Sequence, residues 1–296
     1  MHLPKGWYAI LHINELSHKP KSIERFSKNL VVWSDSKGST VVMDDRCPHR
    51  GASLSSGKIK GDCIACPFHG FEFDQNGVCK NTPESKGAVP KLKAYSYPTK
   101  VVADMVWINT SDNDKENYAL EFAERVYKQY DAKYSLDMDV WNSNIRHCIE
   151  NDLDYTHAIT VHNKTIGAKY NIPDNLSISS GSEHIILSND KLKMEYGFTN
   201  VSSVKFSKNT NLFIFFAPIN ESSTKLYVFL YRSFLVGRFV YKPTNIVFSL
   251  VNRRILKEDR QVVETQNYSE YDSDFLLYHD RMIKAFRDIW SEKTQK

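Results

Sequence analysis

Two short segments, each with one cysteine and one histidine, constrain this chain more than any other feature. The first reads Cys47-Pro-His49 and the second reads Cys66-Pro-Phe-His69. Sixteen residues separate His49 from Cys66, and this stretch has the strand and turn signals of a β hairpin. Two neighbouring loops would then offer two thiolates and two imidazoles to one centre. A [2Fe–2S] cluster uses such a set when both cysteines bind one iron and both histidines bind the other.

The residues around these pairs leave two interpretations of the centre. Gly51 and Gly70 closely follow the pairs, where a turn around a cluster needs a residue without a Cβ and can direct backbone N–H groups at the sulfurs. Structural zinc is the alternative, because Cys and His in fours suit tetrahedral zinc and Cys63-Ile-Ala-Cys66 forms a C-x-x-C pair. We expect the cysteines that match no ligand position to be small, partly buried side chains; these are Cys63, Cys79 and Cys148.

A second group of candidate ligands has the spacing Asn151-x2-Asp154-x2-His157-x4-His162. We predict a helix over residues 145–160, with Asp154 and His157 one turn apart on the same face. His157 and His162 would point about 140° apart on a regular helix, so both can bind one ion only if the helix ends or carries a π-bulge between them. Two histidines and one carboxylate, with open positions left over, form the facial triad of non-haem Fe(II).

Both groups resemble the metal-binding motifs of one family, the Rieske non-haem iron oxygenases. CPHRGASLSSG and CPFHGFEFDQNG, at residues 47–57 and 66–77, resemble the Rieske motif of ring-hydroxylating and demethylating oxygenases. Ala52 and Phe68 stand where Rieske proteins of respiratory complexes usually carry two further cysteines, which favours the oxygenase and ferredoxin branch. The second spacing resembles the family's mononuclear-iron motif, and residues 164–167 after it resemble the O-demethylase branch, typified by vanillate and dicamba demethylases.

The resemblance implies a full ligand set for both centres. The cluster would be bound by Cys47, His49, Cys66 and His69. The mononuclear iron would be bound by His157, His162 and a carboxylate from residues 255–266, which resemble the family's late E-D-x4-E-x-Q element. Because the Asp of that element is the family's ligand, we expect Asp259, with Glu258 and Glu264 as alternatives. Taken alone, these acids would be read as the solvated start of a helix.

Asp154 has a separate role in the resemblance. The matching Asp of the family is not a ligand, and it bridges a cluster histidine of a neighbouring subunit, here His69, to an iron histidine, here His157. Such hydrogen bonds fix the imidazole tautomer and tune the metal. The resemblance thereby also implies a homotrimer, in which cluster and iron are paired across a subunit interface.

Strand and helix signals predict an α+β chain with two domains. Residues 1–112 are expected to be an all-β Rieske domain, because short strand runs are broken by turn signals and no long 3.6-residue period interrupts them. The polar run from Thr110 to Asn117 marks the boundary. Residues 113–296 are expected to be the catalytic domain, an antiparallel sheet flanked by helices. We predict sheet strands at 184–188, 191–198, 211–219, 225–234 and 246–256, a hairpin turn at Asn220 to Ser223 and amphipathic helices within 258–290.

Composition excludes several other classes. With 41% hydrophobic and 25% charged residues, the 296-residue chain has the balance of a globular protein. Lys plus Arg, at 39, barely exceed Asp plus Glu, at 35, so charge gives no support to nucleic-acid binding. The longest apolar runs, such as Leu212 to Ala217, are too short to cross a membrane, and the N-terminus lacks a secretion signal. The odd count of five cysteines does not suit a disulfide framework, and we expect a cytoplasmic protein.

The expected function is that of a terminal oxygenase, in which electrons pass through the cluster to a mononuclear Fe(II) that uses O₂ as co-substrate. The chain lacks a G-x-G-x-x-G element and a plant-type ferredoxin cysteine set, so electrons from NAD(P)H would come through a separate reductase, with or without a ferredoxin. We expect hydroxylation or O- or N-demethylation of a small aromatic or alkaloid-like molecule, with cis-dihydroxylation as the alternative. An electron-transfer Rieske protein and a zinc-binding interaction module are alternatives of other classes. Substrate-pocket candidates are Leu153, Tyr196, Phe198, Phe215, Phe229 and Phe248.

Overall fold

A computed structural model describes residues 2–83, 91–111, 117–169, 172, 175–237, 239–266 and 273–295. The chain divides into two compact units, Ile10–Asp114 and Met1–Ala9 with Lys115–Lys296. The polar run expected at the boundary falls partly on residues 112–116, which lie outside the described residues.

The Ile10–Asp114 unit is built from short strands, with no α-helix among its described residues. They form three sheets with the orders β1-β11-β10, β2-β3-β4-β9 and β5-β6-β7-β8. This arrangement confirms the prediction of an all-β N-terminal region. The strands are β1 (Trp7–His12), β2 (Lys21–Arg25), β3 (Lys28–Ser34), β4 (Thr40–Asp44), β5 (Lys58–Lys60), β6 (Cys63–Ala65), β7 (Glu72–Asp74), β8 (Cys79–Asn81), β9 (Ser96–Tyr97), β10 (Thr99–Val102) and β11 (Met105–Asn109).

A buried cluster anchors the two Cys-His segments within this unit. Val31 and Trp33 of β3 point inward at alternate positions, as a strand requires, and pack with Phe73 of β7. Cys47, just after β4, and Cys66, just after β6, are buried in the same cluster. The segments therefore start from packed strand ends.

The larger unit contains a seven-stranded antiparallel sheet with the order β12-β18-β17-β16-β15-β14-β13. Asn220 and Ser223 pair at the turn between β17 and β18, so the predicted hairpin is confirmed. The strands are β12 (Tyr134–Trp141), β13 (Ser177–Ser180), β14 (His184–Ser188), β15 (Lys193–Gly197), β16 (Val201–Ser207), β17 (Thr210–Asn220) and β18 (Ser223–Arg232). The α-helices are α1 (Tyr118–Gln129), α2 (Ile145–Leu153), α3 (Ala158–Val161), α4 (Tyr241–Val263) and α5 (Arg281–Thr294).

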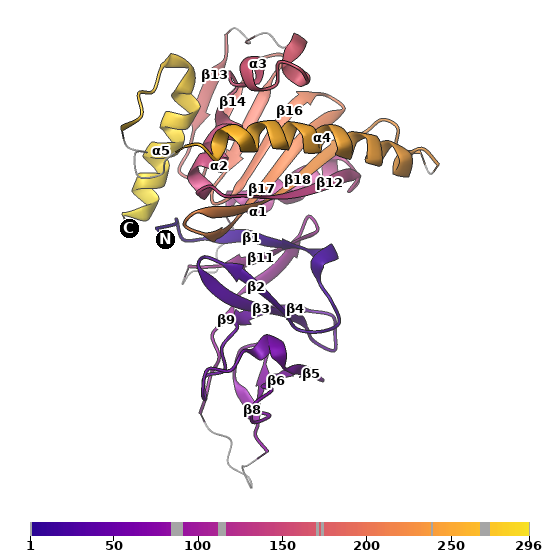
Figure 1. Ribbon diagram of the computed structural model, residues 1–296, viewed down its shortest axis with the longest axis vertical. Helices are drawn as coiled ribbons and strands as arrows, with labels where there is room; N and C mark the ends of the chain where they lie inside the picture. Colours follow the sequence, from indigo (N-terminus) through magenta and orange to yellow (C-terminus); the bar gives the residue numbers. More distant parts are fainter. Residues whose placement is uncertain are drawn as a thin grey trace. The chain divides into compact units, whose positions relative to one another are not determined.

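The two faces of this sheet carry different helices, because successive strand residues point to opposite sides. On one face, Phe213 of β17 meets Phe122 of α1 with ring centroids 4.9 Å apart. On the other, Ile214 belongs to a core shared with α2, α4 and α5. Figure 1 shows α4 lying across the sheet, with α5 near the β13–β14 edge. These layers confirm the predicted antiparallel sheet flanked by helices.

One predicted strand is wrong. Residues 246–256 lie inside the 23-residue helix α4 instead of forming a strand. The run of Ile246, Val247, Leu250 and Val251 has strand-like composition, and a short apolar run does not distinguish strand from helix by itself. The helix continues because its buried positions, Asn252, Leu256, Asp259 and Val263, recur at intervals of four, three and four residues.

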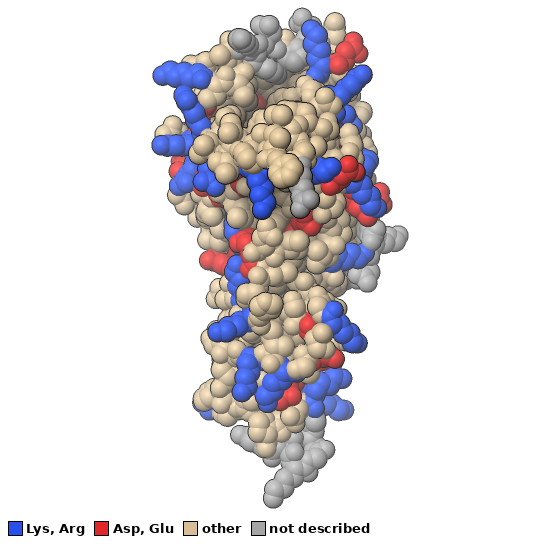
Figure 2. Space-filling view, turned by 90° about the vertical axis from the view of Figure 1, so that its right-hand side faces the viewer, with Lys and Arg blue, Asp and Glu red and all other residues tan. Residues whose placement is uncertain are grey.

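Side chains of both charge signs share the described surface. Figure 2 shows Lys and Arg interspersed with Asp and Glu on the face it presents. Among the described residues, no helix combines the length and the apolar character needed to cross a membrane.

Candidate metal centres

The two Cys-His segments fold into loops with the same hydrogen-bond pattern. In the first, Cys47 N donates to the carbonyl five residues later at 2.8 Å, and Cys47 O accepts from Gly51 N at 2.8 Å. In the second, Cys66 and Gly70 repeat both bonds at 2.8 and 3.0 Å. The two glycines have φ values of +78° and +70°, in the left-handed region that glycine enters without strain. The loops are thus two copies of one turn.

These loops gather the four residues expected to bind the cluster. The His49 and His69 rings have centroids 4.8 Å apart. Burial raises the pKa of the Cys47 thiol to about 11, and the adjacent Cys66 thiol adds to that shift. A buried thiol pair of this kind ionises when a metal supplies positive charge, and coordination deprotonates a thiol outright. The two buried thiols, with the exposed His49 and the half-buried His69, form a donor set that fits a [2Fe–2S] cluster.

The four cluster ligands converge less closely than those of the second centre. Among the described residues, only His157, His162 and Asp259 form a group of three or more metal-binding atoms within 4.8 Å of one another. The remaining cysteines behave as expected, since Cys63 is half-buried and Cys79 and Cys148 are buried.

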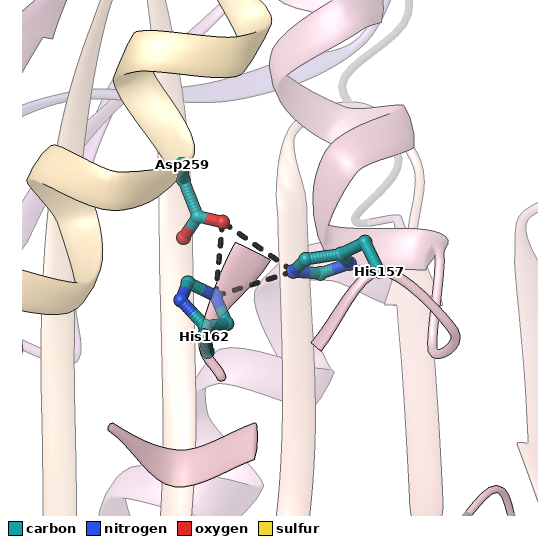
Figure 3. A group of neighbouring side chains, drawn as sticks. All are labelled: His157, His162 and Asp259. Atoms are coloured by element: carbon teal, nitrogen blue, oxygen red, sulfur yellow. Dashed lines mark hydrogen bonds and ion pairs between the residues drawn. The ribbon is translucent and has the colours of Figure 1, made fainter. Parts of the chain in front are cut away.

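The second centre brings together three side chains that are distant in sequence. His157 precedes the single turn α3, His162 follows it, and Asp259 lies four residues before the end of α4. The three side chains point toward one another (Figure 3). The two Nε2 atoms lie 3.3 Å apart, and Asp259 Oδ1 lies 3.3 Å from His157 Nε2 and 3.0 Å from His162 Nε2. His162 is the most buried, with 3% of its side chain exposed.

The hydrogen bonds behind the two imidazoles fix which ring atoms face the centre. His157 Nδ1 bonds the Asp154 carbonyl, which can only accept, so this nitrogen carries the proton. His162 Nδ1 lies 2.9 Å from Glu258 Oε2 and donates to that carboxylate. In neutral rings, both Nε2 atoms then present lone pairs toward Asp259 Oδ1. Three electron-pair donors converge on one point, which is the arrangement that a metal cation requires.

The surroundings of the Asp259 carboxylate favour a cation close to it. Its Oδ1 is buried and, despite the close imidazoles, has no partner with hydrogen-bond geometry among the described residues. Burial alone would lower the pKa of His157 and of His162 and raise that of Asp259. Close contact between the carboxylate and the two rings outweighs burial, so the pKa of each histidine is raised and that of Asp259 is lowered. The site stabilises positive charge, and a metal ion or a proton can supply it.

The two alternative carboxylates are occupied elsewhere. Glu258 lies on the far side of the His162 ring, where Oε2 also accepts from Thr165 Oγ1 at 2.8 Å. Glu264 Oε1 accepts from Asn142 N at 2.7 Å and from an arginine of α4. Neighbouring helix residues point about 100° apart, so Glu258 and Asp259 reach opposite nitrogens of one imidazole. The sequence interpretation missed this orienting role of Glu258, although the adjacent acids were its signal.

The prediction that Asp154 and His157 share one helix face is wrong. Helix α2 ends at Leu153, and Asp154 has extended dihedrals of φ −84° and ψ 102°. The cause is local, because Asp154 Oδ1 accepts from Thr156 N at 2.8 Å and from Thr156 Oγ1 at 2.7 Å, a turn that competes with helix. The helix end expected between His157 and His162 is present, because α3 ends at the residue before His162.

A cavity of about 360 Å³ lies beside the triad. Its walls are mostly apolar, with Leu212 and Ile214 from the sheet and Phe248 and Leu256 from α4. Of the predicted pocket residues, only Phe248 is among the described residues that line it. Phe215 and Phe229 belong to the sheet face that carries α1, and Tyr196 and Phe198 pack against Phe286 of α5. Leu153 is buried in the core.

Three comparisons with known proteins bear on these centres. Residues 6–98 match the Rieske [2Fe-2S] domain. The oxygenase component of 3-ketosteroid-9-alpha-monooxygenase from Rhodococcus rhodochrous is 32% identical over 165 residues, which make up 53% of this chain and 43% of that protein. The chain thus spans less than half the length of this curated relative.

Solved structures match over nearly the whole chain. Dicamba monooxygenase bound to 3,6-dichlorosalicylic acid superposes with a TM-score of 0.80, at 22% identity, over 99% of this chain and 97% of that one. NdmA of Pseudomonas putida CBB5 gives a TM-score of 0.80 at 19% identity, over 99% of this chain and 90% of that one. These matches establish the fold. The chain therefore contains a Rieske [2Fe-2S] domain, and its fold is that of these two solved structures.

Proposed function

We propose that the chain is a terminal oxygenase component that hydroxylates, or O- or N-demethylates, a small organic molecule. The observation that carries this proposal is the convergence of three possible ligand atoms, His157 Nε2, His162 Nε2 and Asp259 Oδ1, at the wall of an apolar cavity. A volume of about 360 Å³ lies in the range of small-molecule sites. In the proposal, these three residues hold iron, and Cys47, His49, Cys66 and His69 hold the cluster.

The chain's own residues prepare the centre for this chemistry. An iron ion with two histidines, one carboxylate and open positions supplies O₂ activation in non-haem oxygenases. Glu258 and the Asp154 carbonyl hold the two imidazoles in the tautomers that present Nε2. The apolar side chains from the sheet and from α4 keep the cavity poor in water and position the substrate by shape.

The relatives support oxygen insertion into one position of a substrate. They are named as a 3-ketosteroid monooxygenase component, a chloroacetanilide N-alkylformylase oxygenase component and dicamba monooxygenase. We place the Rieske domain at residues 1–112 and the catalytic domain at 113–296, and we propose a cytoplasmic homotrimer. The relatives' designation as oxygenase components supports a separate reductase, with or without a ferredoxin, as the electron donor.

The test is substrate-dependent oxygen uptake by protein shown to contain both metal centres, with a surrogate reductase. Methoxy-aromatics and N-methyl compounds should release formaldehyde in proportion to oxygen consumed. Formation of a cis-diol product would show that the reaction is dihydroxylation and not demethylation. Reduction of the cluster without uptake for any substrate class would instead indicate an electron-transfer protein.

Asp154→Asn should lower product formation by about 10- to 100-fold while both metal centres stay occupied, because the change removes a charge and keeps the Oδ1 acceptor of the local turn. In the proposal, that charge orients His69 of the next subunit in the trimer. The measurement is single-turnover product formation after chemical reduction of the cluster. Thr156→Val is the matched control, since it removes the hydroxyl bonded to Oδ1 and leaves the charge. Loss of mononuclear iron with a normal rate per remaining iron would make Asp154 a ligand instead.

A further inference from the structure

Helix α4 carries one polar side chain on its cavity wall besides Asp259. Of its described residues that line the cavity, Asn252 and Asp259 are polar and the others are apolar; these are Phe248, Val251, Ile255 and Leu256. Asn252 also belongs to the buried stripe of the helix, together with Asp259 two turns later. The amide therefore faces inward, on the same side of α4 as the triad.

The amide of Asn252 has no hydrogen-bond partner in the described part of the chain. Its Nδ2 is closed to solvent and unpaired. Its Oδ1 is not closed to solvent, and no described residue donates a hydrogen bond to it. Because Asn252 is only 8% exposed, lies on the inward stripe and lines the cavity, the opening at Oδ1 is toward the cavity. One carbonyl oxygen thus faces the apolar space.

Neither packing nor helix formation explains an asparagine at this position. Asparagine has a lower helix propensity than leucine. A buried amide without hydrogen bonds also costs free energy that an apolar side chain would not. Asn200 shows the usual arrangement, since its buried Nδ2 donates to Ala9 O and to Phe216 O, both at 2.9 Å. A polar group without a partner on the wall of an apolar cavity is typical of a ligand contact.

We propose that Asn252 Oδ1 accepts a hydrogen bond from a hydroxyl or N–H group of the substrate and thereby orients it toward the triad. The inference rests on the proposed function and narrows its substrate class to small, largely apolar molecules with such a donor. Asn252 and Asp259 are seven residues apart, which is about 10 Å along a helix. The donor group and the oxidised carbon therefore lie at opposite ends of the molecule, as in a para-substituted aromatic ring.

The test is equilibrium binding of two matched probes to the fully metallated protein without oxygen. 4-Methoxyphenol carries a hydroxyl where 4-methylanisole carries a methyl group of similar size. The quantity measured by calorimetry is the ratio of the two affinities, phenol over methylanisole. Asn252→Leu should lower this ratio by at least about tenfold, because the phenol hydroxyl is then buried without a partner. An unchanged ratio would show that water or another group satisfies the hydroxyl, and it overturns the proposal.

Ile255→Val is the matched control for binding. It alters the same wall of the cavity without changing a polar group, so both affinities should change alike and their ratio should stay within about twofold. A drop of the ratio in Ile255→Val as large as in Asn252→Leu would trace the preference to cavity shape and contradict the hydrogen bond.

Thermal stability gives a second measurement that needs no ligand. Asn252→Leu should raise the melting temperature by about 2–4 °C, because a buried amide is removed and no hydrogen bond is lost. Asn200→Leu is the matched control, since it removes a buried amide that is bonded to Ala9 and Phe216 and should lower the melting temperature. A lower melting temperature in Asn252→Leu would show a structural partner and contradict the proposal.

The two ideas fail separately. Absence of oxygen uptake with every substrate class would refute the proposed oxygenase and leave the affinity ratio of the two probes measurable. Formaldehyde release from both probes, with the same ratio of kcat/KM values in wild type and in Asn252→Leu, would keep the oxygenase and refute the role of Asn252.

Discussion

Asp259→Ala should abolish product formation and empty the mononuclear site while the visible spectrum of the Rieske cluster stays unchanged. Asp259 supplies the negative charge of the triad, and its Oδ1 is buried without a hydrogen-bond partner among the described residues. Without it, two neutral imidazoles remain and bind a divalent ion weakly. We expect the activity to fall by more than about 100-fold, since even the loss of an outer partner of a metal ligand costs 10- to 100-fold. Iron per chain, measured beside the cluster spectrum, checks the result.

The neighbouring acids provide graded controls for this substitution. Glu258→Gln keeps a hydrogen-bond acceptor near His162 Nδ1 but removes the charge, so iron should be bound more weakly and activity should fall by about 10- to 100-fold. Glu264→Gln should retain iron, because this side chain is bonded to Asn142 and Arg260. If Asp259→Ala keeps full activity and one of the two controls loses iron, the acid changed in that control is the third ligand.

The sequence predicted best what depends on local chemistry. The two Cys-His loops were predicted because a turn around a cluster needs particular residues at fixed short spacings, and both loops do form the same turn. The all-β region and the β17–β18 hairpin follow from alternation and turn residues, which act within a few positions of the chain. The triad was predicted through a resemblance, since no local rule connects His157 to a residue about a hundred positions later.

The predictions that failed concern features set by tertiary structure, or by side chains that compete with the helix for backbone hydrogen bonds. The strand composition of residues 246–256 was overruled by the helix α4, whose inward positions recur every three or four residues. Helix α2 stops before Asp154, because that side chain bonds the backbone that follows it. Four of the five pocket candidates that do not line the cavity are strand residues or follow one, and strand phase alone did not identify their face.

Cys66→Ser should yield protein without the Rieske spectrum, whereas Cys63→Ser should keep it. Wild-type protein should be red-brown, with about two irons and two acid-labile sulfides per cluster and one further iron. Cys66 begins the second loop and lies beside Cys47, and a serine hydroxyl is a poor replacement for the thiolate that iron–sulfur clusters use. Cys63 is the matched control, since it is a half-buried cysteine three residues earlier that pairs through its backbone in β6.

The Cys66→Ser variant should also be less stable, because a cluster bound only by the folded chain contributes its binding free energy to folding. Absorption and electron paramagnetic resonance of the reduced protein measure the cluster, and metal analysis measures iron and zinc. Loss of the spectrum in both variants would mean that Cys63 belongs to the ligand set. Colourless wild-type protein with stoichiometric zinc would contradict the cluster.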